Sequence, residues 1–220
     1  MRYLKRLLKP EILVKKEQEW TEKFLISKKK RPDNSKYGHT KIKEQLNSMS
    51  FHKCFYCETK LKNTPKQIDH YIEISERADI AFDWNNLYLS CTNCNSKIAN
   101  KEISVNEALN PCKDSDNKIQ NHLTFENEII TAKNNSEIGL QTIKKFRLDS
   151  NLLDNLRAKQ LIQFQQLLVK IFQNKENEGR KKMNKTEIES LVRFSQVDYS
   201  FSLMFRILLQ KFGIVDLSEH

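Results

Sequence analysis

The sequence contains no apolar run that approaches the roughly 20 residues that a membrane-spanning helix requires. Its opening, MRYLKRLLKPEILVKK, is interrupted by charged residues and lacks the apolar segment of a signal peptide. Internal repeats and low-complexity tracts are also absent, which excludes a repeat architecture. These absences predict a soluble, globular, cytoplasmic protein, and 220 residues suffice for one large domain or two small ones.

Acidic residues are scarce relative to basic ones. The chain has 38 Lys and Arg against 28 Asp and Glu, a formal net charge of +10. Residues 1–53 hold 15 of the basic residues and 6 of the acidic ones, so this stretch carries a net charge of +9. A clustered excess of this kind favours a nucleic-acid-binding face over a diffuse, solvated lysine surface.

Cysteine is the residue type whose spacing is most informative. Four of the five cysteines form two Cys-x-x-Cys pairs, Cys54/Cys57 and Cys91/Cys94, while Cys112 stands apart. Each pair places two thiolates on one tight turn, and two such turns complete a tetrahedral sulfur shell for Zn²⁺. Redox chemistry is the competing interpretation in a reducing compartment, but the Asp-His dipeptide between the pairs favours structural zinc. We expect Cys112 to be a small buried residue.

The hydrophobic pattern predicts a small metal-stapled unit around these cysteines. Residues 67–72 and 87–89 are predicted as short strands, and residues 95–101 have a helical pattern. Strand, loop, strand and helix, with metal ligands at the junctions, make a ββα-metal unit. Amphipathic spacing predicts two helices before it, over 11–28 and 39–49.

Helices dominate the rest of the sequence. We expect a hairpin at 123–130, a longest helix that runs to about Gln173, and final helices at 186–195 and 199–211. The predicted fold class is therefore α+β and mostly helical, with a treble-clef-like ββα core and helices on both sides. The predicted domains are a basic N-terminal helical segment, the zinc-knuckle core and a C-terminal helical region suited to partner docking, at residues 1–50, 51–126 and 127–220.

The chemistry between the cysteine pairs centres on Asp69-His70, at the end of the first predicted strand. If the backbone bends there, both side chains can serve one site. Asp69 then offers a hard oxygen ligand to Mg²⁺ or Mn²⁺, and His70 offers a base that titrates near neutral pH. Phosphodiester hydrolysis needs both, because a base activates water while a metal ion stabilises the developing charge. Asn86 can accept a hydrogen bond from His70 or hold the loop.

Asn95 follows the last cysteine and can give a second oxygen to the catalytic metal ion, with helix capping as its structural alternative. Lys97 and Lys101 lie in the same predicted helix and can contact phosphate. The candidate catalytic residues are Asp69, His70, Asn86 and Asn95, with Asp69 and Asn95 as the divalent-metal ligands and Lys97 and Lys101 as nucleic-acid contacts.

The pattern resembles the HNH endonuclease family in its zinc-stabilised form. The residues that carry this resemblance are Cys54-x-x-Cys57, Asp69-His70, Asn86-Leu87 and Cys91-x-x-Cys94-Asn95-x-Lys97. The motif histidine of the family maps to His70, its middle asparagine to Asn86 and its last His or Asn to Asn95, as in HNH-N variants. The chain departs from the family just after His70, where Tyr-Ile-Glu-Ile-Ser replaces a continuation rich in Pro and Gly. The resemblance implies a metal-dependent nuclease with DNA as its default substrate and RNA, including tRNA, as an open alternative.

Residues 1–150 also resemble the PtuB family, the HNH subunits of Septu anti-phage systems. The residues that carry this second resemblance are Pro10, Trp20, Phe51–Glu58, the Asn-Pro-Cys at 110–112, His122-Leu123 and Thr142-Ile143. It implies a PtuA-like ATPase partner that restrains or triggers the nuclease. Because some Septu systems travel with retrons, it also implies a retron reverse transcriptase and its msDNA as further partners.

Two other functions are compatible with parts of the sequence. A zinc-stapled nucleic-acid- or protein-binding module without catalysis accounts for the cysteines and the charge. It gives no reason, however, for Asp69, His70, Asn86 and Asn95 to coincide. A stand-alone HNH restriction or homing nuclease predicts full activity without a partner.

Overall fold

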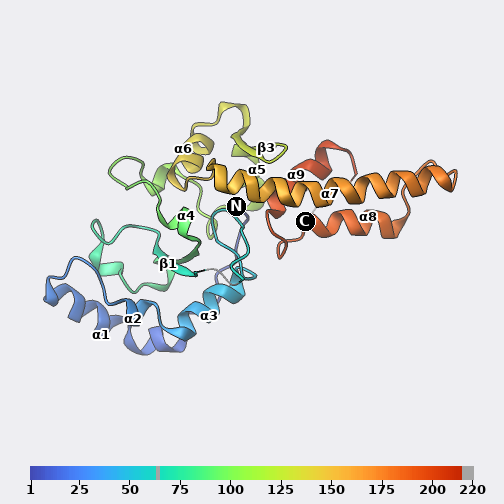
Figure 1. Cartoon of the computed structure of the whole chain (residues 1–220). Helices are drawn as coiled ribbons and strands as arrows, with labels where there is room; N and C mark the ends of the chain where they lie inside the picture. The colour runs from blue at the N-terminus through green and yellow to red at the C-terminus, as the bar shows by residue number, and fades with distance from the viewer. Residues whose placement is uncertain (63–64, 215–220) are drawn as a thin grey trace.

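The computed structural model describes residues 1–62 and 65–214; residues 63, 64 and 215–220 of the predicted domains lie outside the described residues. Helices make up most of the described chain (Figure 1). The α-helices are α1 (Glu11–Ser27), α2 (Asn34–Tyr37), α3 (Thr40–Met49), α4 (Thr92–Asn95), α5 (Asp116–His122), α6 (Glu137–Lys145), α7 (Asn151–Asn177), α8 (Lys185–Val192) and α9 (Ser202–Lys211). Short 3₁₀ helices are η1 (Ala78–Ile80), η2 (Trp84–Asn86), η3 (Val105–Glu107), η4 (Lys133–Asn135) and η5 (Arg193–Ser195).

Two small antiparallel sheets accompany the helices, which makes the fold α+β. The strands are β1 (Gln67–His70), β2 (Leu87–Ser90), β3 (Leu123–Glu126) and β4 (Ile129–Ala132). β1 pairs with β2 in a register that places Asp69 opposite Tyr88 and His70 opposite Leu87. β3 and β4 form a hairpin, and Asn127 in its turn has φ 55°, a left-handed conformation that asparagine tolerates.

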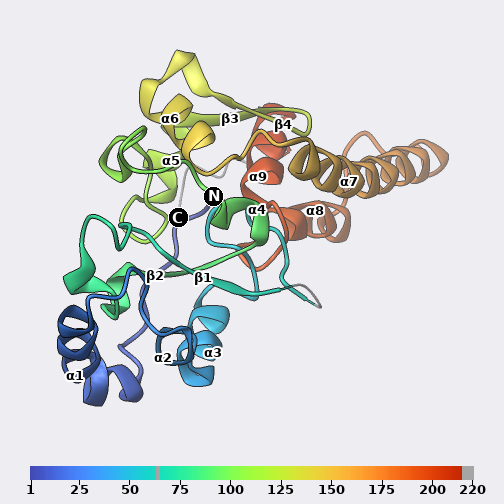
Figure 2. The same cartoon turned by 60° about the vertical axis from the view of Figure 1, so that its left-hand side comes forward.

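The β1–β2 sheet lies between two groups of elements (Figure 1 and Figure 2). α1, α2 and α3 lie on one side of it, while α6 and the β3–β4 hairpin lie on the other. α7 and α8 run side by side and extend away from this body as an arm. The sheet is therefore flanked by segments from both halves of the chain.

The N-terminal segment packs on the loop between β1 and β2. Phe82 in that loop is fully buried and meets the rings of Trp20 and Phe24 from α1, with centroids 5.7 and 6.3 Å away. Arg6 donates a hydrogen bond to the carbonyl of Trp84 at 3.1 Å. Burying a large aromatic side chain contributes about 1.5–3 kcal/mol, so these contacts hold the basic segment against the cysteine-bearing core.

An aromatic stack joins that core to the end of α6. The rings of Tyr71, Tyr88, Tyr56 and Phe146 follow one another, with centroid distances of 4.7, 5.9 and 4.1 Å. Pairs of this kind add about 0.5–1.5 kcal/mol each beyond the area they bury. The core predicted at 51–126 therefore shares its packing with residues that follow it in the chain.

The base of the arm has its own aromatic cluster. Phe164 from α7 meets Phe194 and Phe205 at centroid distances of 5.2 and 5.3 Å, and the latter two rings lie 5.0 Å apart. These contacts anchor α7 on α9 and η5. Among the described residues, no helix combines the length and the apolarity needed to cross a bilayer.

Most of the predicted elements are confirmed. α1, α3, the two strands of the core and the later hairpin lie where the sequence pattern places them. α7 is the longest helix in the described chain and ends at Asn177, beyond the predicted end at Gln173. The last helix begins at Ser202, later than the 199 predicted for it.

The prediction of a helix over 95–101 is wrong, because α4 ends at Asn95. The chain then turns inward, and the N–H of Ile98 donates to the carbonyl of Lys145 at 2.9 Å instead of continuing the helix. This hydrogen bond joins residues far apart in the sequence, and it outweighs the helical pattern of residues 95–101. The spacing of apolar residues in that segment does not indicate the bond. The two lysines of this segment therefore do not share a helix.

Candidate active site and metal centre

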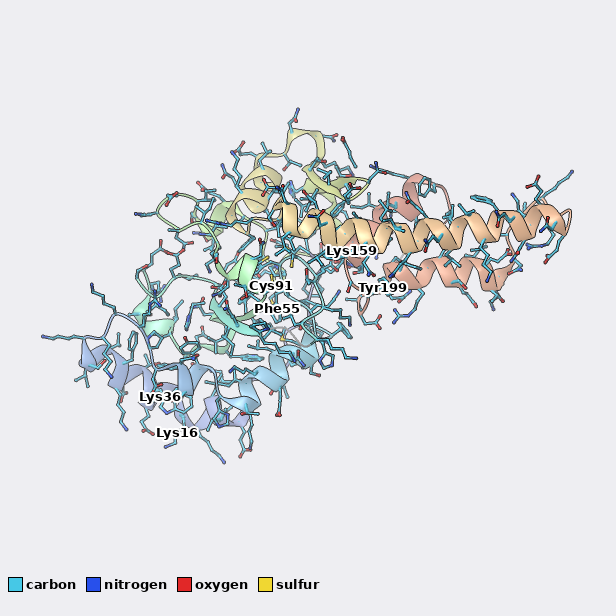
Figure 3. All side chains as sticks on the ribbon, in the orientation of Figure 1. Lys16, Lys36, Phe55, Cys91, Lys159 and Tyr199 are labelled. Atoms are coloured by element: carbon cyan, nitrogen blue, oxygen red, sulfur yellow. The ribbon has the colours of Figure 1, made fainter. Side chains whose placement is uncertain are left out.

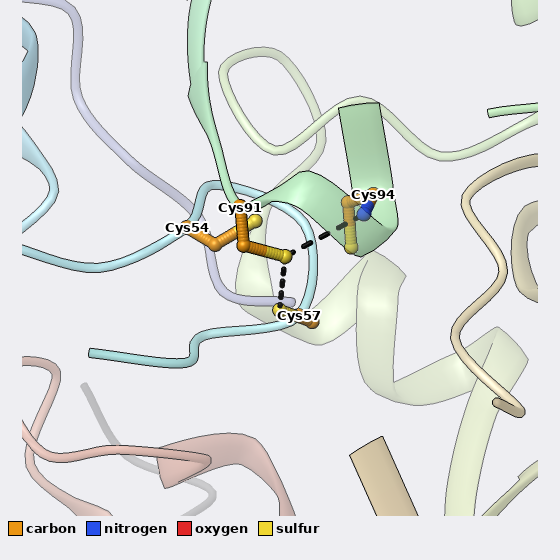
Figure 4. A group of neighbouring side chains, drawn as sticks. All are labelled: Cys54, Cys57, Cys91 and Cys94. Atoms are coloured by element: carbon orange, nitrogen blue, oxygen red, sulfur yellow. Dashed lines mark hydrogen bonds between the residues drawn. The ribbon is translucent and has the colours of Figure 1, made fainter. Parts of the chain in front are cut away.

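Four cysteine sulfurs converge at the junction of the core elements (Figure 4). Cys54 and Cys57 come from the turn before β1, and Cys91 and Cys94 from the end of β2 and from α4. All four Sγ atoms lie within 4.8 Å of one another, and those of Cys57 and Cys91 are 3.7 Å apart. Tetrahedral Zn–S bonds of about 2.3 Å place sulfurs about 3.8 Å apart. The donor set and its spacing therefore fit Zn²⁺, as predicted.

Local hydrogen bonds and burial shape this cluster. Sγ of Cys91 accepts the N–H of Cys94 at 3.5 Å and so caps α4. Burial raises the pKa of the Cys54 and Cys94 thiols, and hydrogen bonds with neighbouring cysteines act in the same direction for Cys94. Thiolates that are buried from solvent need a neighbouring positive charge to be stable. A Zn²⁺ ion among the four sulfurs would supply that charge.

Tyr56 connects the cysteine cluster to Asp69. It lies between Cys54 and Cys57, and its hydroxyl donates to Oδ2 of Asp69 at 2.6 Å. Tyr56 is fully buried and Asp69 is 7% exposed. Burial, followed by the nearby Asp69 charge, raises the pKa of the Tyr56 phenol, so the hydroxyl stays a neutral donor. One turn thus positions both the zinc ligands and the carboxylate.

His70 ends β1 with its two ring nitrogens in different roles. Nε2 lies 2.8 Å from the carbonyl oxygen of Ala81, and because a carbonyl only accepts, Nε2 carries the proton and Nδ1 keeps its lone pair. The ring of Tyr37 packs edge-on against the imidazole, with centroids 4.8 Å apart. Burial lowers the pKa of His70. A neutral imidazole with a free Nδ1 is equipped to act as a general base.

Asn86 holds the loop that supports His70. Its Oδ1 accepts the N–H of Ile72 at 2.7 Å, while Nδ2 donates to the carbonyls of Ile72 and Ile80 at 3.1 and 3.3 Å. Asn86 is buried, and Ile80 directly precedes the residue whose carbonyl orients His70. Of the two roles predicted for Asn86, loop holding is the one whose contacts are present.

Lys97 turns inward and meets three oxygens. Its ammonium donates to Oδ2 of Asp69 at 2.9 Å and to the carbonyls of His70 and Tyr71 at 2.6 and 3.0 Å. The Lys97 and Asp69 side chains are 5% and 8% exposed. The ammonium neutralises Asp69 and fixes the backbone where β1 ends.

Asp69 and Asn95, the predicted ligands of a second cation, both carry side-chain oxygens and line the same cleft. The contacts of Tyr56 and Lys97 fall on Oδ2 of Asp69, and no described residue hydrogen-bonds to Oδ1. Oδ1 of Asn95 accepts a hydrogen bond from Ser90 at 3.2 Å, which orients its amide. A carboxylate oxygen and an amide oxygen fit Mg²⁺ or Mn²⁺, which prefer oxygen ligands.

Three of the predicted catalytic residues line one cleft, whose volume is about 510 Å³. Asp69, His70 and Asn95 line it from β1 and α4, and Lys30 and Arg31 line it from the connection between α1 and α2. His70, the side-chain oxygens of Asp69 and Asn95, and the cationic side chains of the loop therefore line one space.

The lysines predicted to contact nucleic acid occupy different environments. Lys97 lines the cleft but its ammonium is bound to Asp69, as described above. Lys101 is exposed and is not among the described residues that line the cleft. Phosphate contact by these two side chains stays a prediction.

Two aromatic residues of the site were not foreseen from the sequence. Tyr56 lies in a zinc-binding turn, where nothing marks a tyrosine as a partner of Asp69. Tyr37 comes from α2, and its contact with His70 depends on how the N-terminal helices dock on the sheet. The Cys-x-x-Cys spacing alone gives no signal for either contact.

A family model described as HNH endonuclease matches residues 54–101. The matched stretch contains the four cysteines together with Asp69, His70 and Asn95. With the strand order of the core and the cysteine cluster, the match identifies an HNH endonuclease domain, of a family whose members hydrolyse phosphodiester bonds.

The chain is homologous to the Septu protein PtuB. It is 30% identical over 158 residues to Septu protein PtuB of Bacillus thuringiensis, an alignment that covers 71% of this chain and 57% of that protein. It is 28% identical to Septu protein PtuB of Bacillus mycoides (strain KBAB4), over 66% of this chain and 59% of that protein. The chain thus spans somewhat more than half the length of these curated relatives.

Proposed function

We propose that this chain is a metal-dependent endonuclease that cleaves nucleic acid as the effector of an anti-phage defence complex. The observation that carries the proposal is that His70, whose Nδ1 is hydrogen-bonded by no described residue, shares one cleft with the oxygen donors Asp69 and Asn95. A binding module without catalysis gives no reason for this convergence.

The residues divide the work of hydrolysis. Nδ1 of His70 accepts a proton from the attacking water, while its Nε2–H stays hydrogen-bonded to Ala81 and keeps the ring in place. A divalent cation held by Asp69 and Asn95 would stabilise the charge that develops on the scissile phosphate. Lys97 holds Asp69 in place through its hydrogen bond to Oδ2.

We infer the substrate and the partner from the similarity to known families. DNA is the proposed substrate, with RNA, including tRNA, as the alternative that the experiment below distinguishes. Homology to the Septu PtuB proteins supports a PtuA-like ATPase as the partner that restrains or triggers cleavage. A stand-alone nuclease would act without it.

The test compares the unmodified chain with His70→Ala, each alone and with the ATPase, on plasmid DNA and total RNA in Mg²⁺ or Mn²⁺. We expect cleavage that His70→Ala lowers by about 10²–10⁴-fold. His52→Asn is the control, because His52 is exposed and lies outside the cleft. Identical products from the unmodified chain and His70→Ala would remove the catalytic assignment, and full activity without the ATPase would favour the stand-alone nuclease.

A further inference from the structure

Four consecutive basic residues lie between α1 and α2, at Lys28–Arg31 in the sequence. α1 ends at Ser27, and Lys28 has φ 53°, the left-handed conformation that turns a chain sharply at a helix end. The turn directs Lys30 and Arg31 to the cleft that contains His70. A basic segment is thereby placed beside the general base.

Among the described residues, Asp33 interacts with Lys29 through its charge, but it forms no ion pair with any of these four side chains. By contrast, other lysines of the same region form ion pairs, such as Lys15 with Glu11 and Lys16 and Lys23 with Glu19. None of Lys28–Arg31 takes part in an ion pair of the described chain, and all four are exposed. Their charge is therefore available to a ligand.

The two acidic side chains that line the cleft, Asp69 and Glu73, each lie close to a lysine ammonium. Asp69 is bound to the Lys97 ammonium. Oε1 of Glu73 accepts the N–H of Asn100 at 2.9 Å and lies 3.6 Å from the Lys145 ammonium. The charge that the cleft offers to a ligand is therefore the positive charge of the loop, which favours an anion beside His70.

The basic surface continues past the cleft. Lys29 and Lys36 line a neighbouring hollow of about 210 Å³, and the Lys36 ammonium lies 5.9 Å from the centre of the Trp20 ring. Figure 3 shows Lys36 among the N-terminal helices. Positive charge that extends over more than one hollow suits an extended polyanion better than a single phosphate.

We propose that Lys30 and Arg31 bind the phosphates that flank the scissile bond, and that Lys29 and Lys36 continue this track along the nucleic-acid strand. The inference rests on the proposed function and specifies how its substrate is held. Contacts to phosphate carry no sequence information by themselves, so the loop supplies affinity and register rather than base preference. Cleavage at His70 then occurs on the strand that the loop holds.

This inference is tested by measuring how tightly the chain binds nucleic acid, and not by measuring cleavage. The affinities of labelled single-stranded DNA, duplex DNA and RNA oligonucleotides are measured by fluorescence anisotropy between 50 and 200 mM salt, in the His70→Ala chain. We expect the double variant Lys30→Ala/Arg31→Ala to bind about tenfold more weakly at low salt. The slope of log affinity against log salt should fall in magnitude by about 1.4–1.8, the value for two phosphate contacts. The three oligonucleotides show whether the track prefers DNA or RNA.

Two controls make the result specific. Lys181→Ala/Lys182→Ala removes the same charge from the connection between α7 and α8, away from the cleft, and should leave affinity unchanged. Lys30→Arg/Arg31→Lys keeps both charges and should retain the affinity. Equal affinity of the loop variant and its parent, an equal loss in the control at 181 and 182, or no binding by the parent would each overturn the inference. Failure of the proposed catalysis would instead appear as cleavage that His70→Ala leaves intact.

Discussion

The ammonium of Lys97 lies 2.9 Å from Oδ2 of Asp69, and both side chains are nearly inaccessible to solvent. The same ammonium binds the carbonyls of His70 and Tyr71, so its donors are satisfied. A lysine predicted to contact substrate phosphate forms an ion pair with the carboxylate expected to hold the catalytic cation. The negative charge of Asp69 is therefore paired within the protein before any substrate binds.

Removing that ammonium should destabilise the fold. Lys97→Met leaves Asp69 buried without its cation, and breaking a buried ion pair in this way costs about 3–5 kcal/mol. The free energy of unfolding in urea, measured with zinc in excess, is the readout. Lys101→Met is the matched control, since Lys101 is exposed and should change stability by less than about 0.5 kcal/mol. Equal stabilities for the two variants would show that the Lys97–Asp69 pair contributes little.

The pKa of His70 should lie below the ordinary histidine value of about 6.5. Burial is the main cause of this depression, and the Lys97 charge acts in the same direction, as would a divalent cation at Asp69. A lowered pKa keeps the neutral base populated as the pH falls, so the acid limb of the cleavage profile should lie below pH ~6.5. NMR titration of the imidazole resonances measures the pKa directly, without cleavage. A His70 value above the ordinary histidine value of about 6.5 would contradict the burial argument.

The cysteine cluster should be required for folding. Cys91→Ser removes one of four ligands, and because a structural zinc site couples metal binding to folding, we expect loss of zinc together with loss of soluble protein. Cys112→Ser is the control, since Cys112 lies outside the cluster. Metal analysis by mass spectrometry and far-UV circular dichroism provide the readouts. A soluble, well-folded Cys91→Ser protein without zinc would refute the structural role.

Asn86 should act through the loop and not through the reacting atoms. Asn86→Ala leaves the backbone groups of Ile72 and Ile80 without their partners, which costs about 1–3 kcal/mol. Activity should fall because the loop no longer fixes Ala81 and His70. Asn85→Ala changes an exposed neighbour and serves as the control. An Asn86→Ala chain of full stability with abolished cleavage would instead indicate direct participation in catalysis.

The sequence is most informative where chemistry dictates spacing. Tetrahedral thiolate coordination requires the two Cys-x-x-Cys turns, and the predicted cluster is present. Asp69 and His70 are the last two residues of β1, and both line one cleft, as predicted for a pair that serves one site. The alternation of apolar and polar residues likewise indicated the first strand of the core, β1.

Contacts between distant segments could not be predicted in this way. The helix expected after Asn95 is absent because the backbone of Ile98 bonds to Lys145, and the same inward turn delivers Lys97 to Asp69. Neither contact has a local signature. The placement of Lys30 beside His70 likewise depends on the docking of α1 and α2, which no residue spacing specifies.

The hydrogen bond from Tyr56 to Asp69 affects how chelation experiments are interpreted. Tyr56 lies between Cys54 and Cys57, so a reagent that strips zinc from this cluster would also release the residue that holds Asp69. Loss of cleavage in EDTA therefore reports on both metals at once. Activity that Mg²⁺ or Mn²⁺ restores without added zinc identifies the exchangeable ion, whereas activity that also requires zinc reports on the turn that carries Tyr56.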